Sequence, residues 1–212
     1  MKIKSFIFNP FQENTYIIYD ETKQCIIIDP GCYTLEEQNI LKKFITNKKL
    51  KPVKLVNTHC HIDHILGNNF VSKEWNIELY IHKEDLPLLD SATIISETYG
   101  LKDYQRSPHP KYFLNHGDKL SFGKSSFEVL FTPGHAPGHI SLYNKPNNIL
   151  VVGDVIFKKS IGRTDLPGGS YETLIKTIKD IIFKLPNSTH VLCGHGPSTN
   201  LGFEKENNPF LI

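Results

Sequence analysis

Short apolar runs alternate with amphipathic stretches along the whole chain. Near the N-terminus, residues 2–8, 15–19 and 24–29 have the length and β-branched content of strands, with turn-forming residues between or after them. A helical pattern of apolar positions follows, and Thr34 and Glu37 have the spacing of a capping box at its start. The first part of the chain is therefore predicted to be three strands followed by a helix.

The same kinds of element recur in the rest of the chain. Further strands are predicted at residues 53–58, 78–82, 119–122, 126–131, 139–144, 148–153 and 189–193. Helices are predicted at residues 64–75, 83–96 and 171–184, and residues 97–117 are predicted to be irregular. Apolar strands interleaved with amphipathic helices indicate sheets covered by helices, and 212 residues fit one large domain spanning residues 1–212.

Composition narrows the classes of partner and the compartment. The formal net charge of +2 is too balanced to favour nucleic acid or a membrane surface as the main partner. No apolar stretch reaches the roughly 18 residues of a membrane span, and the N-terminus lacks the pattern of a signal peptide. The four cysteines show no CxxC spacing, which favours reduced thiols. We therefore expect a soluble protein that stays in the cytoplasm.

Four of the predicted strands run directly into side chains that bind metals. These side chains are His59, His61, Asp63 and His64 after VKLVNT, His135 after FEVLFTPG, Asp154 after ILVVG, and His195 after HVLCG. Residues at strand ends can converge at one edge of a sheet, with rigid backbone behind them and open loops in front. The pattern predicts one site built from all seven residues.

The number of these residues indicates how many ions the site holds. Imidazole and carboxylate groups are good ligands for zinc and similar divalent cations. Seven ligands are too many for one tetrahedral ion, but they suit two adjacent ions that share one ligand. Asp154 is the natural bridge, because a carboxylate has two oxygens. We expect two divalent ions, with zinc as the first expectation and iron or manganese as alternatives.

Polar residues of these types also have purely structural roles. An isolated histidine is typically a surface or packed residue, which we expect of His82, His109, His116 and His190. Asp63 alone is compatible with a helix cap, Asp29 with a turn, and Cys60 and Cys193 with small buried thiols. Four His and Asp side chains within residues 59–64 are different, because without a cation they would incur desolvation and mutual repulsion.

The motifs resemble those of the metallo-β-lactamase superfamily. They are THCHIDH at 58–64, TPGHAPGH at 132–139, GD at 153–154 and CGHGP at 193–197. The resemblance covers nearly the whole chain and implies an αββα sandwich with its site along one edge between two sheets. It also implies a role for each ligand. One ion would be bound by His59, His61 and His135, the second by Asp63, His64 and His195, with Asp154 bridging the two and Asp29 supporting the ligands.

Within this superfamily, the chain resembles a short form of the hydroxyacylglutathione hydrolases, the glyoxalase II group. GRTDLPGGS at 162–170 and GPSTNLGFEKENNPF at 196–210 carry this likeness. The chain departs from full-length glyoxalase II because it ends soon after His195, so we expect no helical C-terminal domain to bind glutathione. Lys158 and Arg163 are the cations expected to meet the carboxylates of a glutathione-like substrate. The alternatives are a solvated loop and an internal pair between Arg163 and Asp165.

The expected activity is metal-dependent hydrolysis of a thioester such as S-lactoylglutathione. A hydroxide shared by the two ions would attack the carbonyl, and Asp63 and Asp154 would accept or orient its proton. The first rival is an iron-dependent persulfide dioxygenase of the same fold, which needs one iron at His59, His61 and His135. The other rivals are a different hydrolase of this superfamily and a non-catalytic module in which metals only stabilise the fold.

Overall fold

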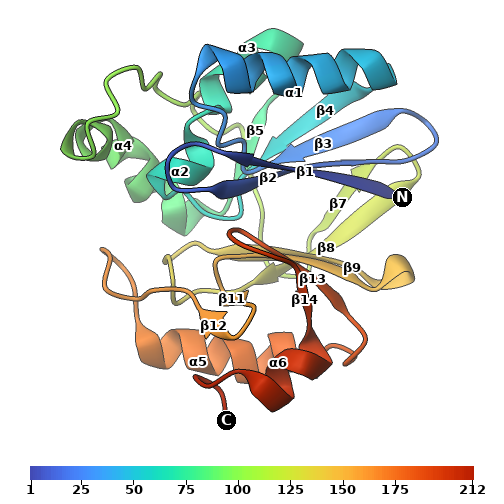
Figure 1. The fold of residues 1–212 in the computed structure, drawn as a ribbon, viewed down its shortest axis with the longest axis vertical. Helices are drawn as coiled ribbons and strands as arrows, with labels where there is room; N and C mark the ends of the chain where they lie inside the picture. The colour runs from blue at the N-terminus through green and yellow to red at the C-terminus, as the bar shows by residue number, and fades with distance from the viewer.

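Two mixed sheets pack face to face, and helices cover both outer faces, so the predicted αββα sandwich is confirmed (Figure 1). The computed structural model describes residues 1–212. The first sheet has the order β1 (Lys2–Phe8), β2 (Glu13–Tyr19), β3 (Gln24–Ile28), β4 (Lys51–Val56), β5 (Leu79–Ile81) and β6 (Tyr112–Phe113). The second has the order β14 (Thr199–Asn200), β13 (His190–Cys193), β10 (Ile149–Gly153), β9 (Ile140–Asn144), β8 (Ser125–Phe131) and β7 (Lys119–Phe122).

The helices divide between the two outer faces and one end of the sandwich. Helices α1 (Leu35–Lys48) and α3 (Asn68–Trp75) lie over the first sheet, and α5 (Tyr171–Asp180) and α6 (Leu201–Asn207) lie under the second (Figure 1). Helices α2 (Ile62–Ile65) and α4 (Leu86–Thr98) lie at the left end in this view. A small hairpin, β11 (Ile156–Phe157) and β12 (Ser160–Ile161), and three 3-10 turns at Lys83–Asp85, Lys145–Asn147 and Ile182–Lys184 complete the chain.

The core lies between the sheets and beneath the helices. Side chains that alternate along β2 and β3, such as Ile18 and Ile26, pack against Phe127, Val129 and Leu142 of the second sheet. The opposite faces of the same strands contribute Ile17 and Ile27 to the cluster under α1 and α3. Because both faces of these strands are buried, the strands are nearly continuous apolar runs in the sequence.

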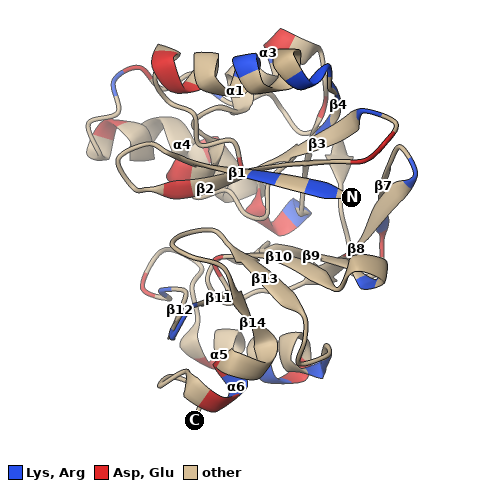
Figure 2. Ribbon diagram, turned by 45° about the vertical axis from the view of Figure 1, so that its right-hand side comes forward, with Lys and Arg blue, Asp and Glu red and all other residues tan.

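The outer strand β1 is an exposed sheet edge that carries positive charge. Lys2 and Lys4 are exposed on it, and Figure 2 shows blue stretches on β1 near the N-terminus. Lysine on an edge strand discourages pairing with another chain. None of the helices is both long and apolar enough to cross a membrane.

Most predicted elements are observed, and the differences have local causes. The capping box is present, since Thr34 N donates to Glu37 Oε2 over 2.9 Å and Glu37 N donates to Thr34 Oγ1 over 3.2 Å. The helix predicted at 64–75 is instead split into α2 and α3 around Gly67. Gly67 N donates to Pro30 O over 2.7 Å, and a Cβ there would lie 2.5 Å from Cys32 Sγ.

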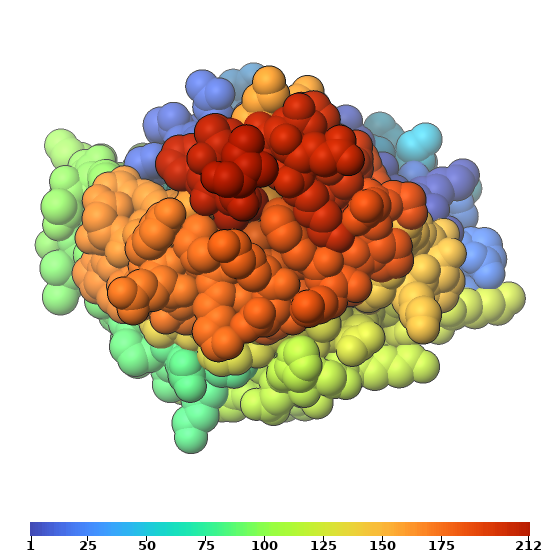
Figure 3. Space-filling model, turned by 90° about the horizontal axis from the view of Figure 1, so that it is seen from below, coloured from blue at the N-terminus to red at the C-terminus, as the bar shows by residue number.

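The end of the chain holds elements that the pattern did not predict. The helix predicted at 171–184 ends at Asp180 and continues as a 3-10 turn, and β14 and α6 follow the last predicted strand. Figure 3 shows α6 in red beside α5 in orange on the underside of the molecule. The buried Glu204 of α6 accepts hydrogen bonds from Lys159 N over 2.9 Å and from Thr199 Oγ1. This segment therefore fixes the β11–β12 hairpin, which forms one wall of the site.

Candidate metal centre

The seven predicted ligands gather at one end of the sandwich, between the two sheets. His59 and His61 follow β4, and Asp63 and His64 lie in α2. The other three follow strands of the second sheet: His135 after β8, Asp154 after β10 and His195 after β13.

Two groups of three can each converge on one point. One nitrogen from each of His59, His61 and His135 lies within 4.8 Å of the others, and the same holds for the ligand atoms of Asp63, His64 and His195. Asp154 lies between the groups, because its Oδ2 is 3.5 Å from His135 Nε2 and its Oδ1 is 3.5 Å from His64 Nε2. This is the placement that a bridging carboxylate requires.

Hydrogen bonds from behind orient the imidazoles. The Nδ1 atom of His135 lies 2.7 Å from Arg163 O, that of His195 lies 3.1 Å from Phe11 O, and that of His64 lies 3.2 Å from Asp29 Oδ2. A partner on one ring nitrogen fixes the tautomer and leaves the other nitrogen free to bind a metal. In these three residues Nε2 therefore faces the centre.

Asp29 lies where the resemblance implies that it supports the ligands. Its Oδ1 accepts a hydrogen bond from Thr58 N over 2.7 Å, and its Oδ2 accepts one from Thr58 Oγ1 over 2.6 Å. The same Oδ2 faces His64. Asp29 is buried and has a φ of +49°, a left-handed conformation that aspartate tolerates better than most residues. It therefore connects the end of β3 to both the first and the second ligand group.

The two groups differ in their electrostatics. Burial, together with neighbouring histidines, holds the pKa of His59 well below its usual value. Burial also lowers the pKa of His61, to about 3. Burial also disfavours the charged form of His64, but Asp63 and Asp154 outweigh it and raise the pKa of His64. The pKa of Asp154 is depressed despite its burial, because His64 and His135 stabilise the carboxylate. The first group is thus neutral imidazole, and the second is rich in carboxylate.

Unpaired polar atoms in the cluster fit a bound cation. His59 Nε2 and Asp154 Oδ1 are buried and have no hydrogen-bond partner. Buried polar atoms are almost always paired, so an unpaired nitrogen and an unpaired oxygen in one cluster fit a site that binds an ion. His61 Nδ1 and His135 Nε2 face each other at 2.8 Å. This donor set of imidazole and carboxylate suits divalent cations such as zinc, iron or manganese.

Two residues that sequence reasoning missed organise the ligand loops. His139 is fully buried, stacks on His59 with a centroid separation of 5.0 Å, and accepts a hydrogen bond from Asp154 N over 3.1 Å. Asp85 is also fully buried and accepts from Cys60 N over 2.6 Å and from Gly138 N over 2.5 Å. The second histidine of TPGHAPGH was a signal for His139, whereas nothing in the local pattern distinguishes Asp85.

The glycines beside the ligands allow the backbone to come close. A Cβ at Gly194 would collide with Asp154 Oδ1 and lie 2.9 Å from a ring carbon of His64. Glycine at this position therefore leaves room for the carboxylate between the two groups.

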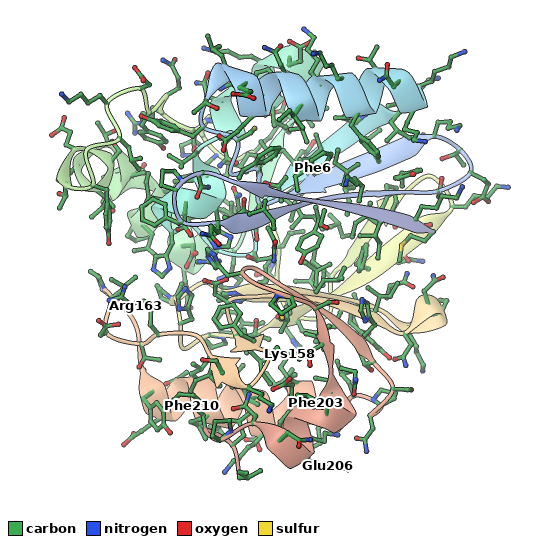
Figure 4. The ribbon with its side chains drawn as sticks, in the orientation of Figure 1. Phe6, Lys158, Arg163, Phe203, Glu206 and Phe210 are labelled. Carbon is green, nitrogen blue, oxygen red and sulfur yellow. The ribbon has the colours of Figure 1, made fainter.

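The two predicted substrate-binding cations lie in different surroundings. Arg163 lines the cavity in front of the ligands and forms two hydrogen bonds of 2.7 Å with Asp165, the internal pair expected as an alternative. Lys158 does not line this cavity, and its Nζ lies 5.9 Å from the ring centroid of Phe203. Figure 4 shows Arg163 on the outer loop at the left, whereas Lys158 lies above Phe203, away from that loop.

The ligands lie at the bottom of a cavity of about 520 Å³. Five of them form its floor: His61, Asp63, His135, Asp154 and His195. A cluster of ordered imidazoles and carboxylates at the bottom of a cavity is the arrangement of a metal-dependent enzyme, because ions held there remain open to a substrate.

Comparison with known proteins agrees with this class. A model of the metallo-beta-lactamase superfamily matches residues 8–195. The chain belongs to this superfamily and is a metal-dependent hydrolase of it.

Relatives of similar length carry hydrolase names. The probable metallo-hydrolase YqgX of Bacillus subtilis is 38% identical over 212 residues, which cover 100% of this chain and 98% of the relative. The hydroxyacylglutathione hydrolase GloC of Haemophilus influenzae is 33% identical, with the same coverage of 100% and 98%.

Solved structures also superpose over the full length. The BLEG-1 B3 metallo-beta-lactamase is 34% identical with a TM-score of 0.91, and 100% of both chains is covered. The TTHA1623 protein, in a di-iron-bound form, is 36% identical with a TM-score of 0.88, covering 98% of this chain and 100% of that one.

Proposed function

We propose that this protein hydrolyses thioesters at a centre of two divalent metal ions, and that S-lactoylglutathione is the first substrate to assay. The observation that carries the proposal is a cluster of seven imidazole and carboxylate groups at the cavity, some of whose buried atoms have no hydrogen-bond partner. The hydroxyacylglutathione hydrolase among the relatives supports the choice of substrate. The reaction would take place in the cytoplasm on a small-molecule thioester.

The ligand roles follow from the two groups. His59, His61 and His135 would hold one ion, and Asp63, His64 and His195 the other, with Asp154 between them. When bound, such ions lower the pKa of a water molecule to about 7 and polarise a substrate carbonyl. Zinc is the first expectation, and the di-iron form of TTHA1623 supports iron as an alternative.

The chain's own carboxylates would handle the proton. Asp63 Oδ2 lies 3.0 Å from His195 Nε2, and the pKa of Asp63 is lowered because His64 and His195 outweigh its burial. Asp63 and Asp154 are therefore both ionised, and either can accept or orient the proton of the attacking water. A thiolate leaving group has a pKa near 8.5, so it needs little acid assistance.

Two cations near the cavity differ in how far they would have to move to meet the rest of the substrate. Arg163 borders the cavity, and its guanidinium would have to exchange its bonds to Asp165 for bonds to a substrate carboxylate. Lys158 would need to leave Phe203 to reach the cavity. If Arg163→Ala leaves the KM for S-lactoylglutathione unchanged, its proposed role is wrong.

One experiment tests the proposed function. The purified protein is analysed for metal content, then assayed for S-lactoylglutathione hydrolysis beside oxygen uptake on glutathione persulfide. Two ions per chain with thiol release would support the proposal. One iron per chain with oxygen uptake would support the rival dioxygenase instead. If the protein shows neither activity, both hypotheses are contradicted.

A further inference from the structure

The walls of the cavity above the metal centre are apolar on both sides. One wall is a single face of α4, where residues spaced three or four apart turn toward the cavity. This face consists of Leu88, Ser91, Ala92 and Ile95, and Tyr99 extends it just after the end of α4. Another wall comes from the β11–β12 hairpin and the loop after it, where the apolar residues Phe157, Ile161, Leu166 and Pro167 line the cavity together with Ser160. A ligand that fills this space would touch hydrocarbon on two sides.

The cavity has little charge to offer beyond its floor. Arg163 is the one Lys or Arg among the lining residues, and its guanidinium already donates from Nε and Nη2 to the carboxylate of Asp165. Its side chain is 58% exposed, so it lies at the rim and not among the apolar walls. A charged group inside the cavity would therefore lose water without gaining a free counter-ion.

We propose that the natural substrate is a thioester whose acyl group is an apolar chain of medium length, lodged between α4 and the β11–β12 hairpin. This proposal rests on the proposed function. The thiols that carry acyl groups in cells, such as coenzyme A and glutathione, are charged, so the apolar part of such a thioester is its acyl group. The carbonyl lies at the ligands on the floor, the chain fills the cavity, and the charged thiol extends past Arg163 into solvent.

The first test varies the acyl chain on one constant thiol. Acetyl, butanoyl, hexanoyl and octanoyl thioesters of N-acetylcysteamine are assayed with the metal-loaded enzyme. We expect kcat/KM to rise about two- to fourfold per methylene group, because full burial of a methylene corresponds to about a fourfold change in an equilibrium constant. A flat or falling series would overturn the proposal. If the enzyme hydrolyses neither these thioesters nor S-lactoylglutathione, the proposed function itself is overturned.

The second arm varies the thiol at constant acyl group. Hexanoyl thioesters of N-acetylcysteamine and of glutathione are compared with the corresponding acetyl thioesters. The same hexanoyl-to-acetyl ratio on both thiols supports an acyl chain in the cavity. A preference that depends on the thiol alone, whatever the acyl length, would place the thiol there and overturn the proposal.

A matched pair of variants tests the α4 wall itself. Ile95 lines the cavity, whereas its neighbour Ile94 does not and is 69% exposed. We expect Ile95→Asn to lower the octanoyl-to-acetyl ratio of kcat/KM about tenfold, and Ile94→Asn to leave this ratio unchanged. An unchanged ratio in Ile95→Asn would overturn the role of α4.

A second variant covers the case in which Ile95→Asn does not fold. Ser91 lies one turn before Ile95 on the same face of α4, and Ser91→Leu would shorten the cavity without adding a polar group. We expect it to lower kcat/KM for the octanoyl thioester more than for the butanoyl thioester. Equal losses for both chain lengths would overturn the proposal. Thermal unfolding and metal content, measured for each variant, separate a loss of folding from a change of selectivity.

Discussion

At each end of the sandwich, one buried aspartate links the N-terminal half of the chain to the C-terminal half. The two aspartates, Asp20 and Asp85, lie in opposite electrostatic surroundings. At the end away from the ligands, Asp20 follows β2 and accepts hydrogen bonds from Thr22 N over 2.9 Å and from Lys124 N, in the turn between β7 and β8, over 2.7 Å. At the ligand end, Asp85 accepts from Cys60 N and Gly138 N. Both carboxylates therefore connect the N-terminal half of the chain to the C-terminal half.

The difference lies in what surrounds each carboxylate. Although burial favours the neutral carboxyl group, hydrogen bonds from Thr22 and Lys124 lower the pKa of Asp20 to about 2. Burial raises the pKa of Asp85 to about 7, despite its two backbone donors. Hydrogen bonds within the chain thus satisfy the carboxylate at the far end, whereas the ligand end leaves buried atoms such as His59 Nε2 and Asp154 Oδ1 without a partner. This cost in stability is typical of a functional site.

Metal removal should have the largest effect, and at the ligand end only. Because the ions would supply both the nucleophile and the polarisation of the carbonyl, we expect a chelator to lower kcat/KM at least about 10³-fold. Amide hydrogen exchange should accelerate at Cys60 and Gly138 and stay unchanged at Thr22 and Lys124. Added metal should restore both. Full activity in a verified metal-free preparation would contradict the metal mechanism.

Asp85→Asn should have the next largest effect, through the ligand loops. Asparagine offers one acceptor oxygen for two backbone donors, so the loops that carry His61 and His135 lose part of their support. Removing a group that orients ligands typically lowers metal affinity about 10- to 100-fold, and we expect this range from competition with a chelating dye. Asp20→Asn is the matched control and should leave the affinity unchanged. Equal affinity in both variants would mean that Asp85 does not position the ligands.

The pH dependence of stability should have opposite signs for the two aspartates. The raised pKa of Asp85 means that the folded state holds its proton up to about pH 7, so its favourable contribution is complete below about pH 4 and is lost as the pH rises to 7. The lowered pKa of Asp20 gives a contribution that is present above about pH 4 and is lost as the pH falls toward 2.

Urea unfolding of the chelated protein can measure both slopes. The difference in unfolding free energy between wild type and Asp85→Asn should decrease from about pH 4 to 7. The corresponding difference for Asp20→Asn should stay constant over that range and decrease below about pH 4. Two flat profiles would contradict the assigned surroundings of both carboxylates.

The contrast also explains what the sequence could predict. The predicted ligands were readable because most of them follow an apolar strand, and the ends of parallel neighbours in one sheet meet at one edge, as Asp154 after β10 and His195 after β13 do. Asp85 was not readable, because its partners lie 25 and 53 residues away and backbone N–H groups leave no mark on the residue type.

The same limit applied to the elements. Gly67 splits a helix only because the Pro30–Cys32 segment packs against it, which is a tertiary contact. The short α6 has too few residues to show a period and depends on its contacts with the β11–β12 hairpin. The αββα sandwich followed from the family resemblance, whereas the strand order within each sheet depends on pairings between distant segments that local patterns do not reveal.

Asp20→Asn should have the smallest effect of the four and should be confined to stability. The variant keeps one acceptor oxygen but loses the charge that Thr22 and Lys124 stabilise, and hydrogen bonds to a charged group contribute about 1.5–3 kcal/mol. Lys124 is exposed and Thr22 half-buried, so water can replace part of what their N–H groups lose. We therefore expect the variant to lose about 1–2 kcal/mol of unfolding free energy, measured by urea unfolding at pH 7. Activity and metal content should equal those of wild type, since no ligand contacts this end. A loss of activity at unchanged stability would show that the two ends are coupled through the sheets, and that the ligand end is not organised by its local loops alone.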